Sequence, residues 1–204
     1  IIRIDHFRGF ESYWEIPFGQ TTAINGKWVK GPGIDFFNKL KEIFGSLNII
    51  AEDLGILTDD VVKLKEDAGL PGMKILQFAF DNDPNNDYLP HMYEENCVVY
   101  TGTHDNDTTQ GWYNSLSYSD RDQVKRYLNN YDDAGVVWNL IRLAHSSIAK
   151  YSIIPMQDYL CLDSSARINT PGVSSGNWMF RIKDNALSDE LANSIAQVTE
   201  HYGR

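Results

Sequence analysis

The chain alternates short apolar segments with longer amphipathic ones along almost its whole length, which limits it to a few architectures. The apolar segments predict five strands, at residues 1–5, 47–51, 73–80, 97–101 and 152–156. The amphipathic segments predict helices at residues 34–44, 58–68, 119–130, 134–150 and 188–201. Aromatic, Gly, Pro, Asp and Asn residues predict loops at residues 10–14, 26–33, 81–87 and 167–176. Strands joined by helices are typical of a parallel sheet covered by helices, so the sequence predicts an α/β fold.

An acidic residue follows closely on each predicted strand: Asp5, Glu52, Asp81, Asp105 and Asp158. In a (β/α) barrel the carboxyl ends of all strands converge on one face, whereas the outer strands of an open doubly wound sheet end far apart. No glycine-rich phosphate-binding motif follows a strand, which also disfavours a dinucleotide-binding sheet. We therefore favour the barrel over the open sheet.

Five strands cannot close an eight-stranded barrel. We therefore expect the chain to be the C-terminal part of a (β/α)8 TIM barrel, about strands 4 to 8, with the N-terminal barrel units absent from this chain. The composition shows no linker and no internal repeat. Residues 1–204 are accordingly expected to belong to one catalytic barrel, with no second domain.

The net charge of −10 argues against a nucleic acid or an anionic membrane surface as partner, because both select basic patches. No apolar run is long enough to span a bilayer, and no signal peptide is visible. Cys97 and Cys161 share no metal-site spacing with histidines, which favours two thiols in a reducing compartment. One disulfide between them is the alternative.

The first predicted strand, taken as buried, ends in charged residues. Side chains alternate along a strand, so Arg3 and Asp5 point to the same side. A guanidinium beside a carboxylate favours its ionised form. The pair has two interpretations: it prepares Asp5 for chemistry, or it only sets the strand register.

Asp5, Glu52 and Asp105 follow three different strands and suit glycoside chemistry. Two carboxyl groups across a glycosidic bond are the minimal apparatus for it, one ionised and one protonated in the retaining case. Asp5, beside Arg3, suits the ionised role. A carboxyl beside a like charge holds its proton more readily, and Glu52 has Asp53 as its neighbour. These residue types alone leave the roles open.

Three segments resemble blocks shared by the 4-α-glucanotransferases, the amylomaltases or disproportionating enzymes of glycoside hydrolase family 77. They are RIDHFRG at 3–9, AEDLG at 51–55 and GTHDNDT at 102–108, in the order of the family. Segments 155–158 and 167–172, with Asn177-Trp178 beyond them, are also similar to the family. The resemblance covers essentially the whole chain.

The resemblance implies that Asp5 is the nucleophile, Glu52 the general acid and then base, and Asp105 the transition-state stabiliser. It implies transfer of α-1,4-glucan segments from a donor maltodextrin to the 4-hydroxyl of an acceptor glucan or glucose. The reaction is a retaining double displacement through a covalent glucosyl-enzyme, for which the nucleophile and the acid stand about 5–5.5 Å apart.

The resemblance also implies substrate-binding positions at Arg3, which would orient Asp5, and at His104, Asp53 and Asn169. It implies maltooligosaccharides and α-1,4-glucans as partners, with no cofactor and no metal. We expect a cytoplasmic protein, or a plastid protein if the source is a plant, and little activity from these 204 residues alone.

Several features have a simpler interpretation. The run His104 to Asp107 could bind Ca²⁺ or Mg²⁺, although histidine is a poor ligand for these ions. His6 and Arg8 could pair only with neighbouring carboxylates. Asp158 could line the site or be a hydrogen-bonding residue at a strand end. The Asp residues at 81–87 are better explained by turns. Loop aromatics could bind sugar or pack against the protein: Tyr13, Trp14, Trp112 and Tyr113. Helical spacing predicts that Phe36, Phe37, Leu40 and Phe44, and also Trp138, belong to the core.

Two other functions remain open on the residues alone. A plain α-glucan hydrolase uses the same carboxyl groups, with water as the acceptor. A non-catalytic glucan-binding module has no use for a nucleophile and an acid.

Overall fold

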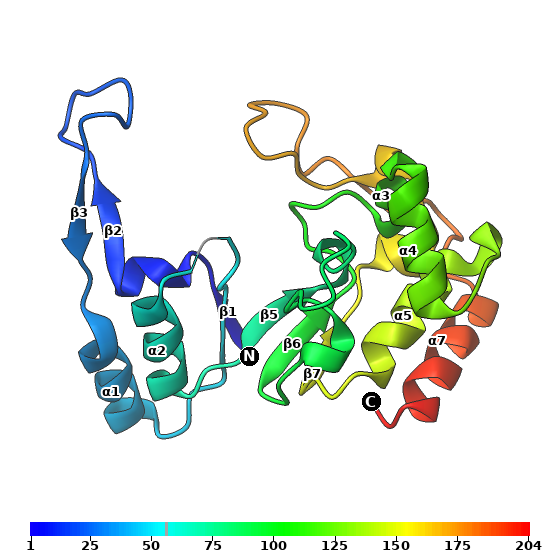
Figure 1. Ribbon diagram of the computed structural model, residues 1–204, viewed down its shortest axis with the longest axis horizontal. Coiled ribbons are helices and arrows are strands. Elements are labelled where there is room, and N and C mark those ends of the chain that lie inside the picture. Colours follow the sequence, from blue (N-terminus) through cyan, green and yellow to red (C-terminus); the bar gives the residue numbers. More distant parts are fainter. Residues whose placement is uncertain (56) are drawn as a thin grey trace. The chain divides into compact units, whose positions relative to one another are not determined.

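The computed structural model describes residues 1–55 and 57–204, and Figure 1 shows their helices and strands. The chain divides into two compact units, Ile1–Met73 and Lys74–Arg204, which we call the N-terminal and the C-terminal unit. Strands and helices alternate along both, so the predicted α/β class is confirmed.

The N-terminal unit is built on a pair of parallel strands. Its elements are β1 (Ile2–Ile4), a 3-10 helix (Phe7–Phe10), β2 (Ser12–Glu15), β3 (Lys27–Lys30), α1 (Gly33–Phe44), β4 (Ile49–Ala51) and α2 (Asp59–Ala68). β1 pairs with β4 in parallel, with Ile4 opposite Ala51. Gly45 and Gly69 end the two helices with positive φ, as the sequence predicts.

The core of this unit lies between its helices and β4. Phe7, Phe37, Ala51 and Val61 are fully buried, and the rings of Phe7 and Phe37 lie 5.5 Å apart. The broader apolar face predicted for α1 is wrong in part, because Phe36 is partly exposed and Phe44 is 70% exposed. The helix buries only the stripe that meets α2 and the 3-10 helix after β1.

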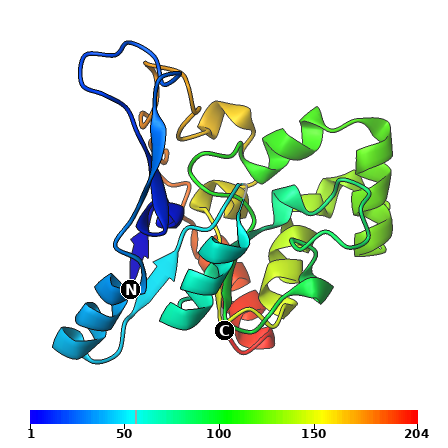
Figure 2. The same cartoon turned by 60° about the vertical axis from the view of Figure 1, so that its left-hand side comes forward.

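Residues 12–15 and 27–30 are strands, whereas the sequence predicts a loop and a turn there. β2 and β3 form an antiparallel hairpin in which Trp14 is opposite Trp28. The two indole rings meet edge to face, with their centroids 5.4 Å apart. Figures 1 and 2 show the hairpin extending well beyond α1 and α2. Both strands contain charged residues at their ends and lack the continuous apolar run of the predicted strands, and cross-strand pairs hold them instead.

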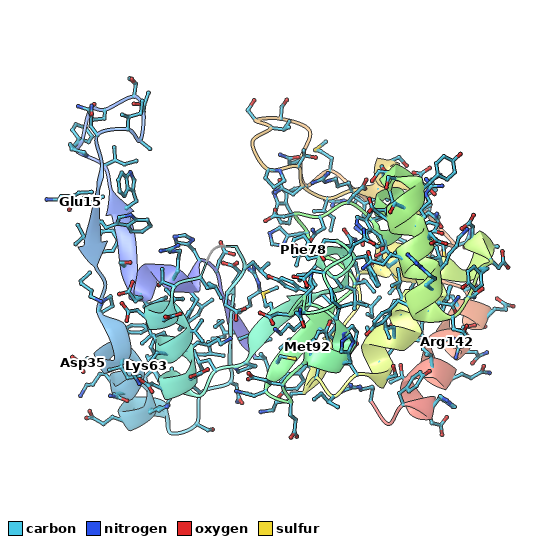
Figure 3. All side chains as sticks on the ribbon, viewed as in Figure 1. Glu15, Asp35, Lys63, Phe78, Met92 and Arg142 are labelled. Atoms are coloured by element: carbon cyan, nitrogen blue, oxygen red, sulfur yellow. The ribbon has the colours of Figure 1, made fainter. Side chains whose placement is uncertain are left out.

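Figure 3 labels Asp35 on α1 and Lys63 on α2, which line an open groove beside the base of this hairpin. The groove has a volume of about 360 Å³ and also contains Glu11 and Lys30, which form an ion pair.

The C-terminal unit is organised around a three-stranded sheet of order β5-β6-β7, in which β6 and β7 are parallel. Its strands are β5 (Gly72–Ile75, which crosses the unit boundary), β6 (Cys97–Tyr100) and β7 (Tyr151–Ile153). Its α-helices are α3 (Thr109–Ser115), α4 (Tyr118–Leu128), α5 (Val136–Ser146), α6 (Met156–Tyr159) and α7 (Asp189–His201). Short 3-10 helices occur at Leu76–Phe78, Pro90–Met92, Asp133–Gly135 and Ser164–Ala166.

The larger core lies in this unit. The inner face of α5 packs with β6 and with Tyr113 of α3, which is buried. Trp138 on α5 is partly buried against the same core. The predicted Ser188 cap of α7 is confirmed, because its hydroxyl accepts a hydrogen bond from the amide of Leu191.

Three other expectations differ from the structure. β5 ends at Ile75 and β7 at Ile153, because a 3-10 helix and α6 follow within three residues. Trp112 and Tyr113 belong to helix α3, not to a loop. β1 is not a buried strand, since Ile2 is 66% exposed in a sheet whose other strand is β4.

The strands described here form a parallel pair, a hairpin and a three-stranded sheet, and they do not close into a barrel. Within residues 1–55 and 57–204, no helix is both long enough and apolar enough to cross a bilayer. Cys97 is a buried thiol and Cys161 an exposed one, so the alternative of a disulfide is not realised.

Candidate active site

Asp5 and Glu52 follow neighbouring strands of the N-terminal unit. Ile4 and Ala51 are opposite each other in the parallel pair, so the next residue on each strand is a carboxylic acid. The backbone pairing continues past the strands: the Glu52 amide donates to the carbonyl of Ile4 at 2.9 Å, and the Phe7 amide donates to that of Glu52 at 3.1 Å. The two carboxyl groups therefore belong to adjacent carboxyl ends of parallel strands.

Asp5 forms the ion pair that strand alternation predicts. Its Oδ1 lies 2.9 Å from Arg3 Nη1, and its side chain is 75% exposed. Arg3 Nε also donates to the sulfur of Met73 at 3.3 Å. Arg3 is thus held at both ends of its guanidinium, and the Asp5 carboxylate stays open to solvent.

The backbone orients the Glu52 carboxylate from two sides. The His6 amide donates to Oε2 at 2.7 Å, and the Leu54 amide donates to Oε1 at 3.0 Å. His6 has φ of 51°, a left-handed conformation that turns the chain after Asp5 and directs this amide. His6, the residue after Asp5, therefore orients the carboxylate of Glu52.

Asp53 is buried and already has protein partners on both oxygens. Lys65 Nζ lies 2.7 Å from Oδ2, and the Met73 amide donates to Oδ1 at 2.7 Å. A Cβ at Gly72 would stand only 2.1 Å from this carboxylate, so the chain needs glycine there. The negative charge of Asp53 is thus paired with Lys65, and the carboxylate links β4 to α2 and β5.

The second carboxylate cluster lies in the C-terminal unit, on the loop after β6. Asn169 Nδ2 donates to Asp105 Oδ1 at 2.5 Å, and His104 Nε2 lies 3.3 Å from the same oxygen. Arg167 donates through Nη2 to the carbonyl of Asp105 at 2.6 Å. The structure therefore brings together three residues predicted from the sequence: His104, Asp105 and Asn169.

Trp178 is a residue for which the sequence analysis proposed no role. Its ring lies 5.2 Å from the His104 ring and is 60% exposed. Its φ of 62° is rare for a bulky residue, and its amide donates to the carbonyl of Ile168 at 2.7 Å. The only sequence signal was its place just beyond the family-like segment 167–172.

Asp158 is buried, and the interpretation as a hydrogen-bonding residue at a strand end is correct. Its carboxylate accepts from Thr101 and Thr109. Burial raises the pKa of Asp158, and its hydrogen bonds oppose that shift. It lines a cavity of about 30 Å³ together with the loop after β6, far smaller than a sugar site needs.

No group of three or more His, Cys, Asp and Glu side chains in the described part of the chain is arranged to hold a metal ion. Asp107 of the candidate cation run instead accepts a hydrogen bond from the Ser164 hydroxyl at 2.6 Å.

Comparison with known proteins agrees with the motifs. The family model for glycoside hydrolase family 77, described as 4-alpha-glucanotransferase, matches residues 1–188. A 4-alpha-glucanotransferase of Clostridium butyricum is 51% identical over 205 residues, which cover 100% of this chain and 42% of the relative. One from Synechocystis sp. is 50% identical over 206 residues, covering 100% of this chain and 41% of the relative.

A solved structure agrees as well. The amylomaltase from Streptococcus agalactiae in complex with acarbose matches with a TM-score of 0.94 at 35% identity. The match covers 99% of this chain and 41% of that chain. The chain thus spans about two-fifths of the length of the relatives it matches. Since the family model covers nearly all of the chain, the chain belongs to glycoside hydrolase family 77, the 4-alpha-glucanotransferase family.

Proposed function

We propose that the protein containing this chain is a 4-α-glucanotransferase, which transfers α-1,4-glucan segments between maltodextrins. The observation that carries the proposal is the placement of Asp5 and Glu52 at adjacent ends of parallel strands, within two of the family-like segments. Two carboxyl groups from neighbouring strand ends suit a nucleophile and an acid that act on one glycosidic bond.

In the proposed reaction, Asp5 attacks C1 of a glucosyl unit while Glu52 protonates the departing glycosidic oxygen. A β-linked glucosyl-enzyme forms with inversion. Glu52, now ionised, takes the proton of the 4-hydroxyl of an acceptor sugar, which attacks C1 and releases Asp5 with a second inversion. Two inversions give net retention of the α linkage.

The surrounding contacts support a role for each group in the proposed reaction. Arg3 orients Asp5 through their ion pair, and two backbone amides direct Glu52. Asp105 stabilises the transition state through sugar hydroxyls, together with His104 and Asn169, which lie against its carboxylate. Asp53 supports the end of β4 and thereby the backbone of Glu52.

We also propose that β1, β4, β5, β6 and β7 are strands 4 to 8 of a (β/α)8 barrel, and that the chain is the C-terminal part of one catalytic domain. Their order along the chain and the parallel pairs β1-β4 and β6-β7 support this. Ile2 on β1 and Ile153 on β7 are 66% and 44% exposed, as expected at edges where further strands would pair.

The proposed partners are maltooligosaccharides and α-1,4-glucans. The acarbose complex of the S. agalactiae relative supports this class of ligand. The net charge of −10 disfavours nucleic acid. Two thiols that form no disulfide suit a reducing compartment such as the cytoplasm or a plastid.

The activity is tested by incubating the complete protein with maltotriose. Transfer yields glucose together with maltodextrins longer than the substrate, because the glucosyl-enzyme is opened by another sugar. Products that are only shorter than maltotriose, with one new reducing end per bond cleaved, would identify a hydrolase and refute the proposed function.

The roles are tested by Asp5→Asn in the complete protein. We expect turnover to fall on the order of 10³-fold or more, because no nucleophile remains, while calorimetry still detects maltooligosaccharide binding. Asp35→Asn, which changes an exposed carboxylate on α1, serves as the control and should leave turnover unchanged. Equal losses of binding and rate in Asp5→Asn would contradict the assignment.

A further inference from the structure

Asp158 is a carboxylate with 1% of its surface exposed, located just after β7 in helix α6. Its Oδ2 accepts from the hydroxyls of Thr101 at 2.5 Å and Thr109 at 2.8 Å, and its Oδ1 accepts from the amide of Thr109 at 2.8 Å. All three donors are satisfied at once. An amide or hydroxyl side chain could not replace it, because only a carboxylate offers acceptors on both arms.

The two threonines stand at the two ends of one loop. Thr101 follows β6, and Thr109 is the first residue of α3, so residues 102–108 form the loop between them. This loop carries His104 and Asp105. One buried side chain from a different strand end therefore joins the start of the loop to its end.

Gln77, in the 3-10 helix that follows β5, also binds both ends of the loop. Its amide nitrogen Nε2 donates to the carbonyl of Asp107 at 2.9 Å, and its backbone amide donates to the carbonyl of Thr101 at 3.3 Å. A Cβ on Gly102 would stand 2.5 Å from the same Nε2, so the loop leaves β6 in close contact with Gln77.

The tip of the loop is held separately. Asn106 Oδ1 accepts from the backbone amide and the hydroxyl of Thr103, at 2.9 and 2.8 Å, which forms a tight turn. Arg167 and Asn169 then hold Asp105 from outside the loop. The tip is thus ordered by its own contacts. Its position relative to the sheet depends on the hydrogen bonds of Asp158 and Gln77 at the two ends of the loop.

The burial of Asp158 costs desolvation free energy, which an apolar side chain filling the same space would not. An ionised carboxylate removed from water is unfavourable unless hydrogen bonds replace its hydration. The hydroxyls of Thr101 and Thr109 and the Thr109 amide replace part of that hydration, and all three donors lie at the ends of the loop. The contacts therefore serve the loop.

We propose that Asp158 is a positioning residue for the glucan transfer reaction, which fixes both ends of loop 102–108 and so sets where Asp105 and His104 stand. The expected effect on catalysis rests on the proposed function. The inference that Asp158 fixes the loop rests on the contacts alone. Asp158 does not touch the sugar, since it is buried beneath the loop.

The test compares Asp158→Ala and Asp158→Asn in the complete protein, with maltotriose as substrate. We expect Asp158→Ala to lower kcat by roughly 10- to 100-fold with little change in KM. The reason is that a small displacement of the Asp105 carboxylate weakens its interaction with the transition state more than its interaction with the bound substrate. Asp158→Asn keeps one acceptor oxygen and should recover part of the loss. Thr101→Val, which removes one donor at nearly constant volume, should give a loss between wild type and Asp158→Ala.

An Asp105→Asn background separates positioning from general damage. If Asp158 acts by placing the loop, Asp158→Ala adds at most about a twofold further loss there, since the group it places is already disabled. A purely structural role would reduce the active fraction equally in both backgrounds. Asp133→Ala is the control: Asp133 also has two side-chain partners, Tyr113 and Lys125, neither of which belongs to loop 102–108, and kcat should not change.

Hydrogen exchange gives a readout that does not depend on activity. In Asp158→Ala the amides of residues 102–108 should exchange at least about tenfold faster, and those of the β2-β3 hairpin should not change. Unchanged exchange in the loop, or equal kcat losses in both backgrounds, would overturn the proposal. A wild-type protein that fails to disproportionate maltotriose would refute the proposed function, while the exchange result would still decide whether Asp158 holds the loop.

Discussion

Glu52 and Asp53 are adjacent in sequence, yet their carboxylates have unrelated partners. Glu52 accepts from two amides at the open strand end, whereas Asp53 is buried against Lys65 and the amide of Met73. In the sequence, Asp53 is a like charge beside Glu52. The structure pairs that charge with Lys65, so the local sequence is a poor guide to which charges interact.

Asp53→Ala separates a supporting role from substrate contact. It leaves Lys65 and the Met73 amide without their partner, so we expect the complete protein to lose about 3 kcal/mol of stability, with KM for maltotriose nearly unchanged. Thermal unfolding and steady-state kinetics measure the two effects. The control is Asp67→Ala, which breaks only an exposed ion pair with Lys63 on the same helix and should cost less than about 0.5 kcal/mol. A raised KM at unchanged stability would instead indicate sugar contact.

Burial raises the pKa of Asp158 above its ordinary value of 3.8, and the charge of Asp107 acts in the same direction. The folded protein thus holds this proton more tightly than the unfolded chain does. Stability is therefore lost as pH rises from about 4 through the folded pKa, and it levels off above that pKa. Asp158→Asn lacks this titration. We expect the Tm of the wild type minus that of Asp158→Asn to fall over this interval, and a rise would contradict the assignment.

Among the elements, the β2-β3 hairpin depends on close backbone contact at its base. The amide of Gly31 donates to the carbonyl of Glu11 at 2.8 Å, and a Cβ on Gly31 would stand 2.3 Å from the carbonyl oxygen of Phe10. A backbone atom cannot move aside as a side chain does. Only glycine fits where β3 leads into α1.

Gly31→Ala should therefore destabilise the protein by about 2–3 kcal/mol through steric conflict. Gly135→Ala is the matched control, because its Cβ would meet the Asn139 amide nitrogen at an ordinary 3.6 Å. That change should be neutral to slightly stabilising. Thermal unfolding of both variants measures the difference, and equal Tm values would show that the hairpin base adapts.

Helices were predicted better than strands. α2 and α7 begin and end within a residue of their predicted bounds, because caps and glycine stops are local signals. α3 was missed, since its seven residues contain Gly111 and show no long periodicity. The hairpin strands were missed because pairs such as Trp14 with Trp28 join residues that are distant in the chain.

At the scale of the whole molecule, the groups proposed for one reaction belong to two units. Asp5 and Glu52 lie in the N-terminal unit, and His104, Asp105 and Asn169 lie in the C-terminal unit. The chain also spans only about 42% of its C. butyricum relative. The proposed activity thus requires a correct arrangement of more than one unit.

A polypeptide limited to residues 1–204 should disproportionate maltotriose at least about 100-fold more slowly than the complete protein, because the reacting groups must be held in register. Glucose release and the appearance of longer maltodextrins measure the rate. Circular dichroism of the same sample shows whether it is folded. Rates within a few-fold of the complete protein would refute the proposal that the chain is an open part of a barrel.

The sequence by itself determined the α/β class and the family, and it supplied the residues proposed for the reaction. These depend on residues that are close together in the chain, such as RIDHFRG and GTHDNDT, and on local periodicity. The tertiary structure alone decided which side chain each carboxylate meets. Asp53 pairs with Lys65 twelve residues away, and Asp158 holds Thr101 across 57 residues. Hydrogen bonds require donors and acceptors within about 3 Å, and only the folded chain sets that distance between residues so far apart in sequence.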